Sequence, residues 1–156
     1  MLIISKKGKG GKRMANDTVK LLKECNSGIK MGTSAMKRII PYAKSYGLKN
    51  ALSACLDEHA ALGEKTTKLL NREGIDAKDS HPIVNVMSTV KIKTKLMISG
   101  SEHTVADLMT DGCDMGIKSL TKNLNIYKRA SDEARGIAED LVASEERLEC
   151  KLRDYL

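Results

Sequence analysis

Gly28-Ile29-Lys30-Met31-Gly32 and Gly112-Cys113-Asp114-Met115-Gly116 place Gly, Met and Gly at the same offsets, 84 positions apart. Both stretches lie inside long patterns of helical period. A glycine in a helix interior costs about 1 kcal/mol relative to Ala, so glycines four apart predict a face that another element approaches closely. The repeat therefore predicts a duplicated helical hairpin, with all four glycines where the first and third helices come closest.

The composition favours an all-α fold. The chain has 156 residues, of which 41% are hydrophobic and 30% charged, with two Pro, four Tyr and no Phe or Trp. An aliphatic core of this kind suits helix packed on helix. No apolar run approaches the roughly 18–20 residues that a membrane-spanning helix needs, and no signal-peptide pattern is present. We therefore expect a cytoplasmic protein without a membrane span.

The net charge of +7 is concentrated near the start of the chain. Residues 14–156 contain 22 basic and 20 acidic residues, so most of the excess lies before them. This pattern predicts a flexible basic leader over residues 1–14 and one domain over residues 15–156. An alternative function for the leader is an arm for nucleic acid or anionic lipid, which so few charges would support weakly. Its five basic residues are Lys6, Lys7, Lys9, Lys12 and Arg13.

The four cysteines are far apart and show no C-x-x-C spacing. This spacing indicates neither a zinc knuckle nor a redox motif. We expect reduced thiols that act as small core residues: Cys25, Cys55, Cys113 and Cys150.

Two helices are predicted in the first half of the chain. Asn16 and Asp17 are candidate N-caps of the first helix, which Pro41 should bend and Gly47 should end in the C′ role. The second helix follows directly and ends at Gly74. Because the turn between them is so short, the two helices should be antiparallel neighbours.

The second half of the chain predicts a crossover and another hairpin. Residues 83–98 have a helical pattern about 24 Å long, which is enough to carry the chain along most of a bundle. Ser101 opens the third helix, and the fourth begins near Ser131.

These features together resemble the ferritin-like superfamily, and in particular an uncharacterised bacterial family of ferritin-like four-helix domains of unknown function. In that family helix one carries G-E-E-G, helix three carries a similar G-E-D, and a helical crossover follows helix two. Gly28 to Gly32, Gly112 to Asp114 and residues 83–98 are similar to those features, and the similarity runs through about residues 17–156. The resemblance implies an antiparallel four-helix bundle of two helical hairpins with a helical crossover between helices two and three.

The resemblance also implies a di-iron site, whose ligand set is degraded here. Such sites take one Glu from each of two helices and Glu-x-x-His from each of the others. By position, Ile29 or Lys30 replaces the helix-one Glu and Cys113 the helix-three Glu. Leu56 replaces the Glu of helix two, and Leu148 replaces the His of helix four. We therefore expect no intact ferroxidase site.

Three candidate ligands remain at the implied site level: His59, Cys113 and Glu145. Thiolate, imidazole and carboxylate are plausible ligands for a single Zn or Fe with an open fourth position. The alternative is a core without metal, in which His59 is a hydrogen-bonded core histidine that pairs with Glu145, and Cys113 fills space.

Three classes of function follow from these patterns. The first is a non-catalytic bundle with a binding, storage-associated or structural role, through self-association or a protein partner. The second is a metal-binding protein or enzyme that uses the three remaining residues. The third, a nucleic-acid or anionic-surface binder, is disfavoured because Lys91, Lys93 and Lys95 alternate and would spread around a helix.

Overall fold

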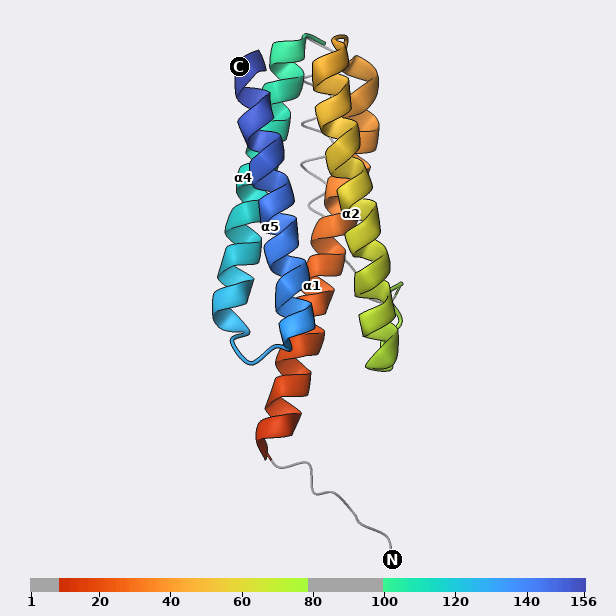
Figure 1. Ribbon diagram of the computed structural model, residues 1–156, viewed down its shortest axis with the longest axis vertical. Helices are drawn as coiled ribbons and strands as arrows, with labels where there is room; N and C mark the ends of the chain where they lie inside the picture. The colour runs from red at the N-terminus through yellow and green to blue at the C-terminus, as the bar shows by residue number, and fades with distance from the viewer. Residues whose placement is uncertain (1–8, 79–99) are drawn as a thin grey trace, which may run out of the picture.

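The computed structural model describes residues 9–78 and 100–156, which form an all-helical bundle without strands in those ranges. Its four long helices lie lengthwise side by side (Figure 1). The predicted all-α class is confirmed. The predicted crossover at residues 83–98 and the lysines at 91, 93 and 95 lie outside the described residues. The helices are α1 (Lys9–Ile39), α2 (Tyr46–Arg72), α4 (Glu102–Ile126) and α5 (Asp132–Leu152), with 3-10 turns at Ile40–Tyr42 and Arg153–Tyr155.

The first helix differs from its prediction at both ends. It begins at Lys9, so the expected start near Asn16 is wrong, and residues 9–14 of the predicted leader form its first turns. At the other end α1 gives way to the 3-10 turn that contains Pro41, because proline removes a backbone donor and its ring clashes with the preceding turn. In Figure 1 the start of α1 extends beyond the end of the bundle.

Gly47 does not end the first helix. It lies in the first turn of α2, whose N-cap is Ser45; the Ser45 hydroxyl accepts a hydrogen bond from the Leu48 N–H. A side chain at Gly47 would meet the hydroxyl of Tyr155, so glycine is needed here for packing rather than for helix termination.

Three other predicted helix boundaries are confirmed. Gly74 has φ +75° and follows α2. The Ile75 N–H donates to the Leu70 carbonyl and the Gly74 N–H to the Asn71 carbonyl, the bond pattern of a Schellman motif. Ser101 and Ser131 are the N-caps of α4 and α5, and each hydroxyl accepts from the N–H three residues on.

The chain after α2 is attached to α1. The carbonyl of Ala77 accepts hydrogen bonds from Asn26 Nδ2 at 2.9 Å and from Lys30 Nζ at 2.7 Å. Asn26 is buried, and a buried amide of this kind needs such a partner.

The apolar core of the described residues consists of two clusters, one toward each end of the bundle. Each helix contributes to both clusters, through residues seven positions apart on one face. These pairs are Ile29 and Met36, Cys55 and Leu62, Cys113 and Leu120, and Leu141 and Leu148.

The cysteine prediction is confirmed for three of the four residues. Cys25, Cys55 and Cys113 are buried free thiols as expected, but Cys150 is exposed, so its predicted core position is wrong.

Within the described ranges, no helix has the length and apolarity that crossing a membrane requires.

Candidate functional site: a polar layer between two apolar clusters

A layer of polar side chains separates the two apolar clusters. We call Cys55, His59, Ser144 and Glu145 the polar layer; the first two come from α2 and the others from α5. His59 is 1% exposed and Glu145 is 9% exposed. Helical spacing places them there, because each lies between two core residues that are seven positions apart on its own helix.

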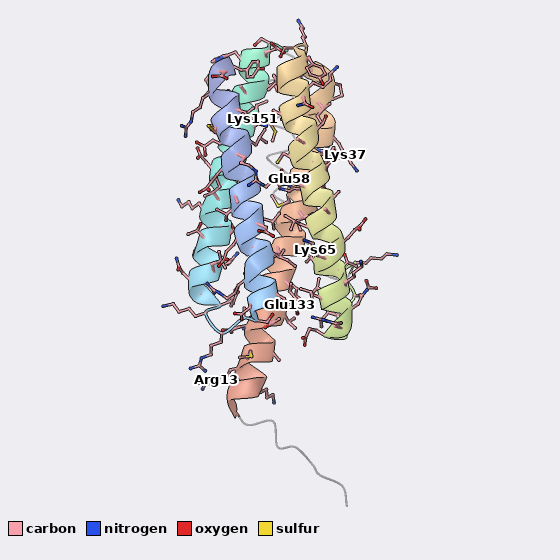
Figure 2. All side chains as sticks on the ribbon, viewed as in Figure 1. Arg13, Lys37, Glu58, Lys65, Glu133 and Lys151 are labelled. Atoms are coloured by element: carbon pink, nitrogen blue, oxygen red, sulfur yellow. The ribbon has the colours of Figure 1, made fainter. Side chains whose placement is uncertain are left out.

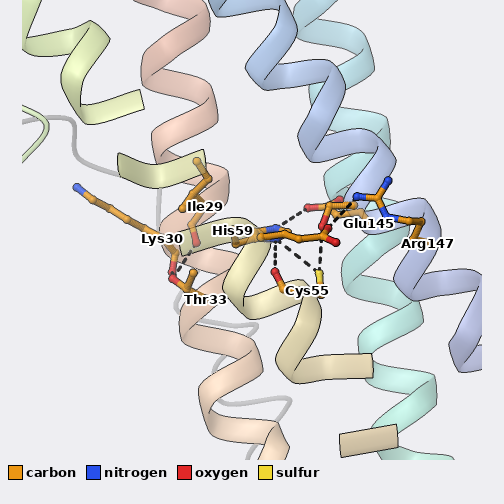
Figure 3. A network of polar contacts seen from close by, with 9 residues as sticks. Ile29, Lys30, Thr33, Cys55, His59, Glu145 and Arg147 are labelled. Atoms are coloured by element: carbon orange, nitrogen blue, oxygen red, sulfur yellow. Dashed lines mark hydrogen bonds and ion pairs between the residues drawn. The ribbon is translucent and has the colours of Figure 1, made fainter. Parts of the chain in front are cut away.

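His59 is held through both ring nitrogens (Figure 3). Its Nδ1 lies 3.0 Å from the backbone carbonyl of Cys55, one helical turn earlier. A carbonyl can only accept, so Nδ1 carries a proton and donates it. Nε2 lies 3.5 Å from Glu145 Oε1, within range of an ion pair. The imidazole therefore bridges the backbone of α2 and the carboxylate of α5.

The surroundings of His59 raise its pKa. Burial acts to lower it, but hydrogen bonds with Cys55 and Glu145 and the charge of Glu145 outweigh that effect and hold the pKa well above its ordinary value of 6.5. The raised pKa favours the imidazolium form at neutral pH, with Nε2–H directed at the Glu145 carboxylate.

A chain of smaller contacts connects the layer to the surface. Cys55 Sγ lies 3.5 Å from both His59 Nδ1 and Ser144 Oγ. Hydrogen bonds from Ser144 and then from Arg147 lower the pKa of Glu58. Arg147 lies 2.8 Å from Glu58 and forms an exposed ion pair with it. The buried thiol and hydroxyl therefore lie directly beneath a charged pair.

Two glycines make room for the buried pair. A Cβ at Gly116 of α4 would overlap both carboxylate oxygens of Glu145, and one at Gly32 of α1 would lie 3.1 Å from His59 Cδ2. At Gly28 and Gly112, by contrast, a Cβ would meet nothing within 4 Å among residues 9–78 and 100–156. The prediction that all four glycines lie at the closest approach of two helices is therefore wrong. The second glycine of each repeat accommodates a polar side chain from a different helix.

Glu145 is incompletely paired. Its Oε2 is buried and has no hydrogen-bond partner among the residues that the structure describes. Oε1 faces His59 of α2 and Oε2 is the atom nearest to Gly116 of α4, so the carboxylate lies between these two helices. A buried acceptor without a partner is rare and marks a place where a proton, a water or a cation would be stabilised.

The structure brings two of the three predicted ligands together. His59 and Glu145 are in contact, whereas Cys113 is buried in one apolar cluster next to Gly116 on α4. Burial and then the charge of Glu145 raise the pKa of the Cys113 thiol, which disfavours the thiolate that a metal would bind. Across residues 9–78 and 100–156, no three His, Cys, Asp or Glu side chains are grouped to hold a metal ion.

The sequence did not identify Cys55 and Ser144 as site residues. Cys55 is four residues before His59 on one helix face, so the helical period could have indicated their contact. Ser144 precedes Glu145, and only the packing of α2 against α5 shows that its hydroxyl reaches Cys55. Ile29 and Leu148, which replace two ligands in the resemblance, are buried in the apolar clusters on either side of the layer.

Comparisons with known protein families, curated proteins and solved structures found no match to this chain. The chemistry of the layer therefore follows from its own donors and acceptors: a buried histidine that is paired with a buried carboxylate.

Proposed function

We propose that this chain is a non-catalytic ferritin-like bundle with a binding, storage-associated or structural role in the cytoplasm. The fold would be two antiparallel helical hairpins. Short connections support this: Ser45 caps α2 six residues after α1 ends, and Ser131 caps α5 five residues after α4 ends.

One observation carries the proposal. The level that the resemblance assigns to metal ligands contains a histidine paired with one oxygen of a carboxylate, with apolar clusters on both sides. A paired charge in a core contributes little net stability, but its partner geometry favours one packing of the helices over others. The polar layer then fixes how α2 and α5 align along the bundle. The function itself is carried by the outer surface, through self-association or binding to a protein partner.

Ferrous iron oxidation in air tests this proposal. Protein with added ferrous iron should show no faster oxidation than buffer, because hydrocarbon replaces two ligands and removes the negative charge that would hold two cations. Rapid oxidation that is lost in His59→Ala but retained in Cys25→Ala would contradict it. Light scattering after size-exclusion chromatography tests self-association. A monomer at all concentrations would exclude self-association and leave binding to a different protein as the proposed role.

The alternative is a single-metal site made by His59, Cys113 and Glu145, with Zn or Fe. The unpartnered Oε2 of Glu145 favours it, since a divalent cation would satisfy that oxygen. Zinc titration of the apo-protein by calorimetry tests this site. Micromolar binding that is lost in His59→Ala and Cys113→Ala, but not in Cys25→Ala, would support it. Binding weaker than about millimolar, or equal in all variants, would exclude it.

A further inference from the structure

The charge of the chain is concentrated on one helix. α1 contains eight basic and two acidic residues, which gives a net +6 of the chain's +7. α5 contains three basic and seven acidic residues. The sequence assigned the basic excess to a flexible leader, but the structure places three of those five leader residues, Lys9, Lys12 and Arg13, on α1 itself.

The cations of α1 lie on its outward face. At 100° per residue they fall opposite the stripe that packs in the core, which includes Leu22, Cys25 and Ile29. The six side chains that we call the basic face are all exposed, and Glu24 is the acidic residue beside them. The basic face consists of Lys12, Arg13, Lys20, Lys23, Lys37 and Arg38.

These six cations have no acidic partner within the described part of the chain. The ion pairs found there join α2 to α5, or lie within α5 and the turn that follows it. Acidic residues of α5 such as Glu133 and Glu139 are thus already paired, with Arg72 and Arg135. No acidic side chain of the described residues therefore neutralises the basic face, and its charge is available to an anionic partner.

The shape of the basic face suits a long polyanion. Lys12 and Arg38 are about 39 Å apart along the axis at 1.5 Å per residue, which is close to one turn of duplex nucleic acid at about 34–36 Å. Figure 2 shows Arg13 on the part of α1 beyond the bundle end and Lys37 far along the same helix.

The same face lacks the features that other anionic partners need. None of its residues is aromatic, so it has no platform on which single-stranded bases would stack. The apolar side of α1 is buried against α2 and the rest of the bundle, so it is not free to insert into a lipid surface. Its cations are suited to phosphates on the outside of a duplex.

We propose that the basic face of α1 binds the phosphate backbone of duplex nucleic acid without sequence preference. This inference goes beyond the proposed structural role and uses none of the polar-layer residues. It shares Lys12 and Arg13 with the disfavoured nucleic-acid hypothesis, adds four exposed cations of α1, and does not use lysines 91, 93 and 95. Because α1 is straight and the duplex backbone curves away from it, we expect about four of the six cations to contact phosphates at once.

Fluorescence anisotropy of the full chain with a labelled random-sequence DNA duplex of about 20 base pairs tests this proposal. With about four phosphate contacts, affinity should fall about 100-fold as salt rises from about 50 to about 200 mM. Lys20→Glu/Lys23→Glu reverses two charges on the basic face and should weaken binding at low salt at least about tenfold. Lys65→Glu/Lys68→Glu is the control: it reverses two charges at the same spacing on exposed positions of α2. It should weaken duplex binding less than about threefold.

The outcomes separate the possible partners. Circular dichroism should show both double variants folded, since all four lysines are exposed. Equal losses in the two variants, or affinity that does not change with salt, would overturn the proposal. Sedimentation with vesicles of one-third phosphatidylserine gives the other comparison: binding to vesicles without binding to the duplex would overturn it in favour of a lipid surface. Rapid oxidation of ferrous iron with duplex binding intact would contradict only the non-catalytic role proposed above.

Discussion

The two glycine repeats have the same pattern in sequence, but their glycines have different surroundings in the bundle. Gly32 and Gly116 lie against side chains from other helices, while no described residue lies within 4 Å of the place of a Cβ at Gly28 or Gly112. The second glycine of each repeat therefore lies against the polar layer, and the first lies against no described side chain. A shared motif thus does not give its members a shared role.

The two glycines that lie against the polar layer also differ from each other. The carboxylate of Glu145 occupies the place of a side chain at Gly116, whereas only the ring edge of His59 approaches Gly32. The repeat on α4 should therefore be the more sensitive of the two, and substitutions in the layer and its glycines can be ranked.

The largest effect should come from Glu145→Ala. This change removes the carboxylate that faces Nε2 and leaves a buried His59 without its ion-pair partner. Breaking a buried pair by removing one member costs roughly 3–5 kcal/mol. Urea unfolding should show a lower midpoint with an unchanged slope. A loss below about 1 kcal/mol would mean that water reaches the imidazole and that the layer is not dry.

Gly116→Ala should be next, with a loss of roughly 2 kcal/mol. The new methyl would displace the Glu145 carboxylate from His59, and this cost should exceed the gain of about 1 kcal/mol in helix propensity. Measured in the Glu145→Ala background, the same substitution should become neutral or stabilising, because the overlapping atoms are absent. An unchanged loss in that background would show that Gly116 serves the backbone rather than the carboxylate.

The stability of the protein should also fall as pH rises. The folded-state pKa of His59 is raised, so its stabilising contribution is complete below the unfolded value of about 6.5 and is lost as pH rises toward the folded value. Each pH unit by which the folded pKa exceeds the unfolded pKa corresponds to about 1.36 kcal/mol, so the loss between about pH 6.5 and pH 9 should exceed about 1 kcal/mol. The measurement is thermal unfolding across that range. Glu145→Ala should flatten the profile, and an equally steep profile would assign the effect to other groups.

The sequence predicted what local chemistry determines. Ser101, Ser131 and Gly74 were recognised as helix boundaries because a serine hydroxyl or a positive φ acts within a few residues of its own position. The start of α1 was missed because three glycines near Lys9 suggested a flexible segment, whereas the helix extends through two of them.

The site was predicted only in part, for a related reason. The sequence left two alternatives open, a metal site and a direct pairing of His59 with Glu145. Helical periodicity placed both residues on core faces but did not determine which faces contact each other. The role of Gly116 could not be predicted, because it depends on a side chain from another helix that is 29 residues away in sequence. Contacts between helices require the packing of the bundle, which the periodic pattern alone does not supply.

Gly32→Ala should change stability by less than about 1 kcal/mol. The methyl would lie 3.1 Å from His59 Cδ2, so the ring must move by a few tenths of an ångström, and this cost should nearly cancel the gain in helix propensity. Chemical denaturation beside Gly116→Ala gives the comparison. A loss as large as that of Gly116→Ala would show that His59 is held as rigidly as the carboxylate.

The smallest effects, of opposite sign, should come from Gly28→Ala and Gly112→Ala. Each methyl would enter open space on an existing helix, so each change should stabilise the bundle by about 0.5–1 kcal/mol through helix propensity and a less flexible unfolded chain. The two positions share no described contact, so the double variant should show the sum of the two gains in thermal unfolding. If either single variant is destabilised, the substituted glycine must be in close contact with another part of the protein, as Gly32 and Gly116 are. The first and second glycines of the repeat would then not differ in role.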